Sequence, residues 1–289
     1  MVSMRPAYSA VFADTKLAAC APLEPIDAVT TQWAWEGSTG EGVKVAVIDS
    51  GVDATHPDVG PVQGYVAIRE GEDLKLVYDT DPHEDSFGHG TACAGLIRSL
   101  APDCDLYSVK VLGSKATGQG RVFAAGVRWA IDNGMQVCNL SLGTTKRDFF
   151  SIFHELADEA YFKNVVLVTA ANNMPIPSYP SVYSSAISVA SHDVQDPYVF
   201  YYNPNPPVEF GALGIDVDIA WQQHKRRKMT GNSYASPHMA GIVTKMLGKH
   251  PGLTIFQIKT ILRELAANVD RNRVSRPPHL LGEDGGGAE

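Results

Sequence analysis

The stretch that decides the fold and the chemistry of this chain reads Thr230-Gly231-Asn232-Ser233-Tyr234-Ala235-Ser236-Pro237-His238-Met239-Ala240-Gly241. It places a serine among small residues and opens an apolar run that continues at helical spacing to Lys249. Pro237 fits the first turn of a helix, where its missing N–H costs nothing. Ser233 is therefore predicted at a helix N-terminus, where free N–H groups and the helix dipole favour a developing anion. A lone serine there is more often only a helix cap, so its role depends on the rest of the chain.

An aspartate ends the first predicted strand. The run Val43–Ile48 is almost wholly apolar and leads into Asp49-Ser50-Gly51. Such a strand is typical of burial on both faces, and hence of a parallel sheet. Open parallel sheets hold ligands beyond the carboxyl ends of their strands, where Asp49 falls. The alternative is a turn-forming aspartate before Ser-Gly.

A histidine between two glycines begins the next predicted helix. Gly88-His89-Gly90 is followed by a run of small residues, which would let that helix approach another element closely. A histidine at such a helix start, beside a cleft, can act as a base. An isolated histidine is more often an ordinary surface or core residue.

Strands and helices are predicted to alternate along the chain, which indicates a parallel, layered α/β domain. The expected strands are 106–112, 135–142, 165–170 and 186–190, with a hairpin over 65–68 and 74–78 and only loop and short strand over 194–220. The expected helices are 30–36, 121–131, 148–161 and a capped helix over 254–267. We divide the chain into an N-terminal arm (1–27), a catalytic domain (28–270) and a disordered C-terminal tail (271–289).

Composition and charge limit which binding partners and which cellular compartment we expect. The 289 residues are 44% hydrophobic and 19% charged, with a net charge of -8 that argues against nucleic acid or an anionic membrane. The first twenty residues lack an apolar signal-peptide core, and we expect no transmembrane helix. No C-x-x-C pair occurs among the four cysteines, so we expect neither a zinc site nor a redox motif. Free cysteines together with the lack of an export signal indicate a reducing cytoplasm. The cysteines are Cys20, Cys93, Cys104 and Cys138.

One acidic cluster invites a metal-site hypothesis. Its members fall within seven consecutive positions: Asp79, Asp81, His83, Glu84 and Asp85. Their spacing matches no ligand pattern for calcium or a transition metal. We interpret the cluster as a solvated, charged loop.

Asp49, His89 and Ser233 occur in that order, and each lies in a characteristic short motif. In these motifs the chain resembles the subtilase (subtilisin-like) serine protease family. The triad order is the one found in subtilisin. The resemblance covers about residues 28–268, and one substitution stands out because Asn232 replaces the threonine of the usual Gly-Thr-Ser motif. The matching segments are Val45–Asp53, His56-Pro57-Asp58, Gly88–Thr91, Gly126–Ile131, Asn139–Gly143, Tyr179-Pro180-Ser181 and Gly231–His238.

The resemblance implies a three-layer, subtilisin-like fold and acyl transfer through a catalytic triad. Ser233 would attack a peptide carbonyl, His89 would move the proton, and Asp49 would orient the imidazole. The family pattern Ala-Gly-Asn is Ala171-Asn172-Asn173 in this chain. The two asparagines leave a one-residue ambiguity, and we assign the oxyanion donor to Asn173. Losing such a donor raises the barrier by roughly 3–4 kcal/mol.

The resemblance also implies how substrate binds. A peptide or unfolded protein would lie extended, adding a strand between Ala116-Thr117-Gly118 and Ser141-Leu142-Gly143. The loop Met174–Ser178 near the expected P1 pocket is shorter than in typical subtilisins and contains two prolines. The family's P1 preference therefore does not transfer.

Three departures from the family shape our remaining expectations. We expect no long prodomain before the catalytic core. The stretch Leu96–Pro102 lacks the insertion that forms a strong calcium site in many relatives, so Asp58, which matches a calcium carboxylate, lacks partners. We expect no metal and no cofactor. Cys93, four residues after His89, resembles the thiol-sensitive branch and suggests inhibition by mercurials, although inert packing explains it too.

Three functions remain open at the level of sequence. The first is a serine endopeptidase selective for a precursor or leader peptide. The second is a peptide ligase or macrocyclase that uses the same acyl-enzyme, and the third is an inactive peptide-binding module. The basic run Lys225–Lys228 would favour acidic residues after the scissile bond, unless it is simply a solvated loop.

Overall fold

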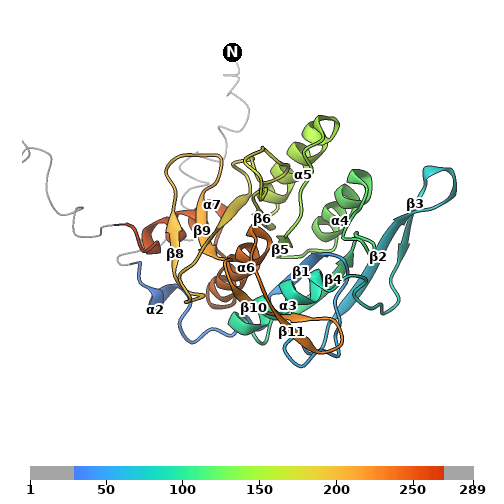
Figure 1. The fold of residues 1–289 in the computed structure, drawn as a ribbon. Coiled ribbons are helices and arrows are strands. Elements are labelled where there is room, and N and C mark those ends of the chain that lie inside the picture. Colours follow the sequence, from blue (N-terminus) through green and yellow to red (C-terminus); the bar gives the residue numbers. More distant parts are fainter. Residues whose placement is uncertain (1–28, 270–289) are drawn as a thin grey trace, which may run out of the picture.

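The protein is described by a computed structural model over residues 29–269 (Figure 1). The predicted arm (1–27) and tail (271–289) lie outside the described residues. The main sheet has nine strands in the order β3-β2-β4-β1-β5-β6-β7-β9-β8, and a separate hairpin pairs β10 with β11. The strands are β1 (Lys44–Asp49), β2 (Gly64–Glu70), β3 (Leu76–Asp79), β4 (Asp105–Lys110), β5 (Val137–Leu140), β6 (Val166–Ala170), β7 (Ile187–His192), β8 (Phe200–Tyr202), β9 (Phe210–Leu213), β10 (Val217–Trp221) and β11 (Lys225–Met229).

All neighbours from β2 to β9 run parallel, and only the two edge strands are antiparallel. The predicted mostly parallel sheet is therefore confirmed. Strand β1 lies between β4 and β5, so Asp49 ends a strand that is paired on both sides. A residue in that position is held by backbone hydrogen bonds to two neighbours.

Helices cover both faces of the sheet, which makes the three layers predicted for the fold. Alternate residues of β1 divide between the two cores: Val45 and Val47 pack with α3 and α6, whereas Ala46 and Ile48 pack with α4 and α5. Burying each such aliphatic side chain contributes about 1.5–3 kcal/mol. The helices are α2 (Thr31–Ala34), α3 (His89–Leu100), α4 (Gly120–Asp132), α5 (Phe150–Phe162), α6 (Asn232–Lys249) and α7 (Ile255–Leu265), with 3-10 turns η2 (Glu72–Leu74) and η3 (Arg147–Phe149).

Helix α6, which carries Ser233, runs through the interior of the molecule. It packs against α3 and against β5, β6, β7 and β9, and its residues are buried on every side over most of its length. A helix that is apolar all round is typical of such a central position. Gly241 allows the close contact with α3, because a Cβ there would lie 2.9 Å from Leu100 Cβ.

The hairpin β10–β11 was not predicted. Its turn uses Gln223 and His224 with positive φ of 60° and 54°, where most hairpins carry asparagine or glycine. Strand β11 is exposed over most of its length, so it also lacks an apolar signature. The turn chemistry and the exposed strand together explain why this hairpin was missed.

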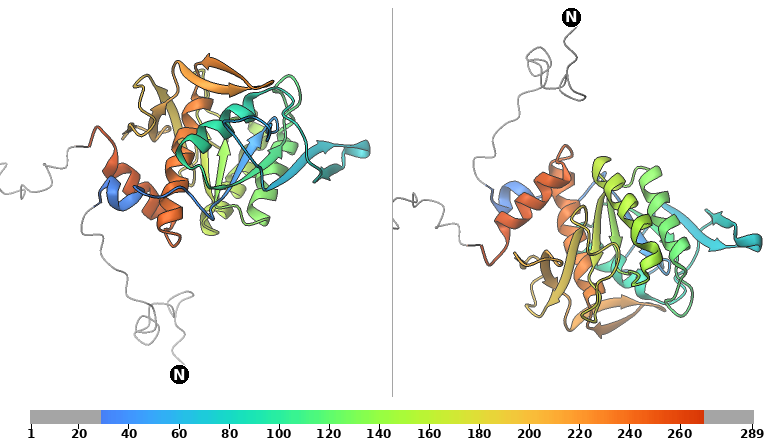
Figure 2. Two further views of the ribbon diagram at one scale, coloured as in Figure 1. Left: turned by 90° about the horizontal axis from the view of Figure 1, so that it is seen from below. Right: turned by 90° about the horizontal axis from the view of Figure 1, so that it is seen from above.

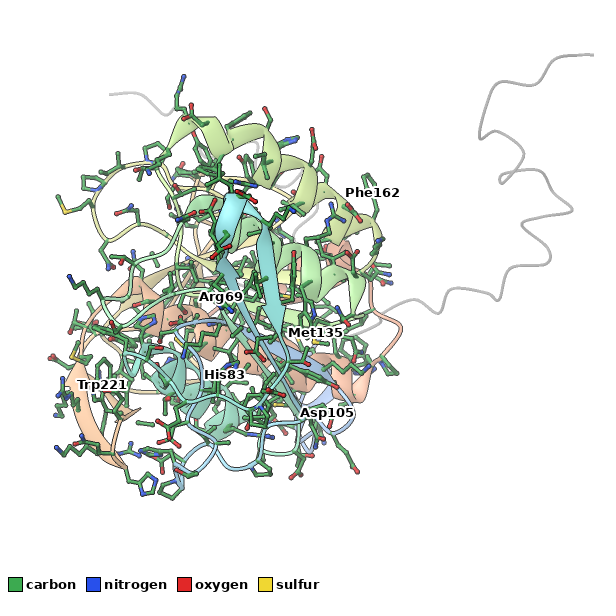
Figure 3. The ribbon with its side chains drawn as sticks, turned by 90° about the vertical axis from the view of Figure 1, so that its right-hand side faces the viewer. Arg69, His83, Asp105, Met135, Phe162 and Trp221 are labelled. Carbon is green, nitrogen blue, oxygen red and sulfur yellow. The ribbon has the colours of Figure 1, made fainter. Side chains whose placement is uncertain are left out.

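The hairpin β2–β3 extends away from the body of the molecule (Figure 2). Figure 3 looks onto this hairpin, on which Arg69 is labelled. Arg121 of α4 anchors it through an ion pair with Glu70 at 3.1 Å and a hydrogen bond to the carbonyl of Leu74. No helix within residues 29–269 has the length and apolar character needed to span a bilayer.

Candidate active site

Each of the three predicted catalytic residues stands at an element terminus. Asp49 is the last residue of β1, His89 is the first residue of α3, and Ser233 is the second residue of α6. Helices α3 and α6 pack against each other, and α3 also packs against β1. The fold thus brings together three residues that are far apart in the sequence.

The aspartate and the histidine form a close pair. His89 Nδ1 lies 2.8 Å from Asp49 Oδ2 and 3.0 Å from Oδ1. Asp49 is fully buried, and the His89 side chain is 14% exposed. Burial lowers the pKa of His89, but the charge and hydrogen bond of Asp49 raise it well above the ordinary histidine value. The imidazole is thereby made a stronger base.

Glycines allow this pair to form. Gly88 adopts φ of 112° at the start of α3, and a Cβ there would lie 2.7 Å from the Trp221 ring. A Cβ on Gly90 would lie 2.0 Å from the carbonyl oxygen of Gly51. A side chain at Gly90 would therefore force α3 away from the loop that follows Asp49.

Asp85 corrects the interpretation of the acidic cluster. Asp79, Asp81 and Glu84 are exposed, as expected for a solvated loop, but Asp85 is 7% exposed. Its carboxylate accepts five hydrogen bonds of 2.7–2.9 Å, which bind the first turn of α3 and the loop after β1 to one group. The donors are the hydroxyls of Ser50 and Thr91 and the backbone N–H groups of Phe87, Gly88 and Thr91.

Asp85 therefore holds the segments that carry both Asp49 and His89. Ser50 extends the network, because its Oγ accepts from the N–H of Gly90 and its own N–H donates to Asp49 Oδ1 at 2.7 Å. The sequence carried one usable signal, since an aspartate a few residues before a helix start often caps that helix.

Cys93 packs between the members of the site. Its Sγ lies 4.0 Å from both Asp49 Oδ2 and His89 Nδ1, and 3.7 Å from the Ser233 carbonyl oxygen. Burial raises the pKa of this thiol. The fully buried side chain is therefore uncharged packing at neutral pH.

Asp49, His89 and Cys93 also form a group whose ligand atoms lie within 4.8 Å of one another. Two ligands of one tetrahedral zinc ion lie about 3.3 Å apart. The 2.8 Å contact between Asp49 and His89 is shorter and fits a direct hydrogen bond better. We interpret the three residues as an acid–histidine pair with a packing thiol.

The start of α6 is fixed by a chain of buried polar groups. Ser141 Oγ donates to the carbonyl oxygen of Ser233 at 2.8 Å and accepts from Asn139 Nδ2 at 2.9 Å. Ser236 Oγ donates to Asn139 Oδ1 at 2.9 Å. Within residues 29–269 no hydrogen bond joins His89 to the Ser233 hydroxyl, which is common in sites without substrate.

A cavity of about 190 Å³ opens beside Ser233. It is lined by Ser141, Leu142, Gly143, Ala170, Ala171, Asn172, Asn173, Ser178 and Ser233. Both candidate oxyanion asparagines line it, but their side chains differ: Asn172 Oδ1 accepts from Met174 N–H, whereas Asn173 Oδ1 accepts from Asn232 N–H at 2.9 Å. Only the Asn173 side chain is bonded directly to the segment that carries Ser233.

The two predicted substrate segments follow the strands on either side of β1. Ser141-Leu142-Gly143 comes directly after β5 and lines the cavity, although the Ser141 hydroxyl is taken by the Ser233 carbonyl. Ala116-Thr117-Gly118 follows β4 and lies outside the cavity lining, in a turn closed by Gly113 N–H donating to the Thr117 carbonyl at 3.1 Å. Neither segment belongs to a strand.

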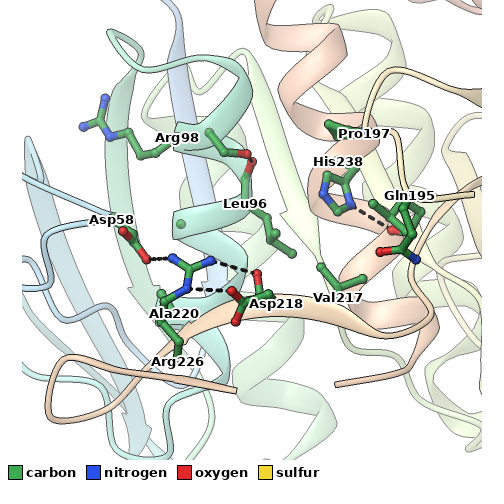
Figure 4. A pocket seen from close by; sticks show the side chains of 13 residues that line it. Asp58, Leu96, Arg98, Gln195, Pro197, Val217, Asp218, Ala220, Arg226 and His238 are labelled. Atoms are coloured by element: carbon green, nitrogen blue, oxygen red, sulfur yellow. Dashed lines mark hydrogen bonds and ion pairs between the residues drawn. The ribbon is translucent and has the colours of Figure 1, made fainter. Parts of the chain in front are cut away.

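The basic run forms β11 and is partly neutralised. Arg226 pairs with Asp58 and Asp218 (Figure 4), so the carboxylate that resembles a calcium ligand faces a guanidinium group. The guanidinium of Arg227 lies 4.8 Å from the centre of the Trp221 ring. The two carboxylates offset the charge of Arg226, so the run offers less positive charge to a substrate.

Comparison with known proteins shows similarity to one family over most of the chain. The sequence profile of the Subtilase family matches residues 40–282. Subtilisin DY of Bacillus licheniformis is 32% identical over 263 residues, which cover 86% of this chain and 90% of that protein. Subtilisin E of Bacillus subtilis (strain 168) is 32% identical over 246 residues, which cover 80% of this chain and 62% of that protein.

A solved structure shares the fold. The crystal structure of a cold-adapted subtilisin-like serine proteinase matches with a TM-score of 0.65 and 24% sequence identity, over 80% of this chain and 86% of that one. A layered parallel sheet with an acid–histidine pair at its carboxyl edge is a known framework of α/β hydrolytic enzymes that work through a serine. Within that class the chain belongs to the subtilase family and is a subtilisin-like serine protease.

Proposed function

We propose that the protein is an endopeptidase whose nucleophile is Ser233, with His89 as general base and Asp49 as its orienting acid. The observation that carries this proposal is the 2.8 Å contact between His89 Nδ1 and Asp49 Oδ2, beside the N-terminus of α6. With Nδ1 bonded to the carboxylate, Nε2 is the nitrogen left to take the serine proton. Asp49 then stabilises the imidazolium as it forms.

The acyl-enzyme would form and break through two tetrahedral intermediates. Ser233 Oγ bonds to the peptide carbonyl carbon, and His89 passes the serine proton to the leaving amine. Water then attacks the ester carbon and gives one proton to His89. His89 returns that proton to Ser233 Oγ as the ester C–O bond breaks, which releases the acid product and restores the serine hydroxyl. We assign stabilisation of the oxyanion to Asn173 Nδ2 and the Ser233 N–H, because the Oδ1 end of Asn173 is held by the Asn232 N–H.

The cavity beside Ser233 supports a preference at P1. Its lining by residues of the 29–269 range includes no charged side chain, and its volume of about 190 Å³ is modest. We expect uncharged P1 side chains to be cleaved faster than lysine, arginine or glutamate. A role in processing one precursor or leader peptide, and a cytoplasmic location, stay predictions.

Chemical labelling combined with product analysis tests this function. A fluorophosphonate should label the folded protein at Ser233, and a peptide library should be cleaved by the wild type but not by Ser233→Ala. Product masses should show the addition of one water. Products lighter by one water, or joined to a second amine, would instead support the ligase function, and absence of labelling would support the inactive binding module.

A further inference from the structure

Asn232, the residue before the proposed nucleophile, has an unusually complete set of partners. Its side-chain Oδ1 accepts from the Ser191 N–H at 2.9 Å, at the end of β7. Its Nδ2 donates to the carbonyl oxygens of Ala171 and Asn172 at 3.2 and 3.1 Å. One amide thus bridges the C-terminal regions of two neighbouring strands.

The main chain of Asn232 acts on the same loop. Its N–H donates to Asn173 Oδ1 at 2.9 Å. Asn173 is exposed, so little packing holds its side chain and its place depends on hydrogen bonds. The loop Ala171–Asn173 is consequently tied to the start of α6 by both the main chain and the side chain of one residue.

We propose that Asn232 is a positioning residue that fixes the distance and direction of the Asn173 amide relative to Ser233. This inference rests on the proposed function, because Asn173 matters only if an oxyanion forms at Ser233. A side-chain amide suits the task, since it offers two N–H donors and a separate acceptor. A threonine, usual at this position in the family, has a single O–H donor and could not bond both carbonyls and the Ser191 N–H in the same way.

Mutational coupling tests this role. Removing an oxyanion donor lowers kcat by about 10²–10³-fold, and misplacing one by an ångström costs about 10²-fold. Asn173→Ala should show the first loss. Asn232→Ala should lower kcat by about 10–100-fold with KM changed less than about threefold, because substrate binding does not use the amide of Asn232.

The decisive measurement is the double variant. If Asn232 acts through Asn173, the variant carrying both substitutions should be no slower than Asn173→Ala alone. Losses that multiply would overturn the proposal, because Asn232 would then act independently of the oxyanion donor. Asn232→Asp, which keeps the acceptor for Ser191 but loses the two donors, provides a second variant should Asn232→Ala unfold.

Asn268 supplies a matched control. Its side chain also bridges main chain, accepting from Tyr202 N–H at 2.9 Å and donating to the Tyr202 carbonyl at 2.7 Å, next to β8. Asn268→Ala should leave kcat within about twofold. A fall in kcat as large as that of Asn232→Ala would mean that Asn232 only supports the fold in general. If the wild type and Ser233→Ala are equally inactive, the proposed function itself fails, and that result is distinct from multiplicative losses in an active enzyme.

Discussion

The pKa of His89 is the residue-scale property that activity should report most directly. A general base must be neutral, so kcat/KM should rise with pH through this pKa. Burial lowers the pKa of His89, but the charge and hydrogen bond of Asp49 raise it well above its ordinary value. The midpoint of the acidic limb should therefore lie above about 6.5.

A pH profile of kcat/KM on an uncharged peptide measures that midpoint. Asp49→Asn removes the negative charge, so the pKa of His89, followed by proton NMR, should fall, and kcat should drop by about 10⁴-fold. A midpoint at or below the ordinary value in the wild type would contradict this account of the pair.

Cys93 should make the enzyme sensitive to mercurials. A mercury atom on Sγ would lie within contact distance of His89 Nδ1 and Asp49, because the thiol is 4.0 Å from each. We expect slow, time-dependent inactivation of the wild type, since the thiol is fully buried. Cys93→Ala should resist, whereas Cys138→Ala should remain sensitive; loss of sensitivity in the Cys138 variant would place the reactive thiol elsewhere.

At this scale, local motifs singled out the predicted catalytic residues, whereas the sequence assigned no role to residues that act through distant partners. Asp49, His89 and Ser233 stand beside glycines and small residues that carry a pattern. Asp85 and Asn232 act through hydrogen bonds to groups that are distant in the sequence. Those partners depend on how strands and helices are juxtaposed, which local spacing does not reveal.

At the scale of the element, the start of α3 depends on one carboxylate. Asp85 binds the first turn of this helix and the loop after β1. Asp85→Asn should lower the free energy of unfolding by about 2–3 kcal/mol, because an amide nitrogen would then face donors. Urea unfolding in a Ser233→Ala background, which avoids self-digestion, measures the change.

Asp81 provides the control for that experiment. It is exposed in the same loop, so Asp81→Asn should change the free energy of unfolding by less than about 0.5 kcal/mol. Equal effects at the two positions would mean that the buried network contributes nothing specific.

Elements with a strong apolar period were predicted closely, whereas exposed ones were not. The predicted strand 165–170 and helix 121–131 correspond to β6 and α4 with boundaries differing by about one residue. Strand β11 is built from exposed, mostly basic residues. The sequence therefore showed a basic run at this position and gave no sign of a strand. Its place over α3 comes from the apolar face of β10, including Ile219 and Trp221.

At the scale of the whole molecule, the two cores on either side of the sheet should unfold as one unit. Leu140 of β5 packs in the core with α4 and α5, and Ile242 of α6 packs in the opposite core; both are fully buried. Each substitution to alanine should cost about 2–5 kcal/mol. Because the sites lie on opposite faces, the two losses should add within about 0.5 kcal/mol.

Equilibrium urea unfolding of the Ser233→Ala protein and its single and double core variants measures this. A single transition in every variant is expected, and Phe256→Ala, at a 68% exposed position, should be nearly silent. Two separated transitions would show that the layers unfold independently. The layered sheet was predictable from the alternation of strands and helices, and burial of β1 on both faces was predictable from its apolar run. The position of β1 between β4 and β5 was not, because pairing between strands depends on contacts that are distant in the sequence.

The contact between Gly90 and the Gly51 carbonyl has a consequence for how this sequence can evolve. With 2.0 Å between that oxygen and a Cβ on residue 90, the position has no room even for a methyl group. Gly252, by contrast, has no atom of the described part of the chain within 4 Å of its Cβ site. Gly252 can therefore be replaced during evolution, whereas Gly90 must stay glycine. Position 90 should accordingly serve as a fixed reference point when distantly related sequences are aligned with this chain.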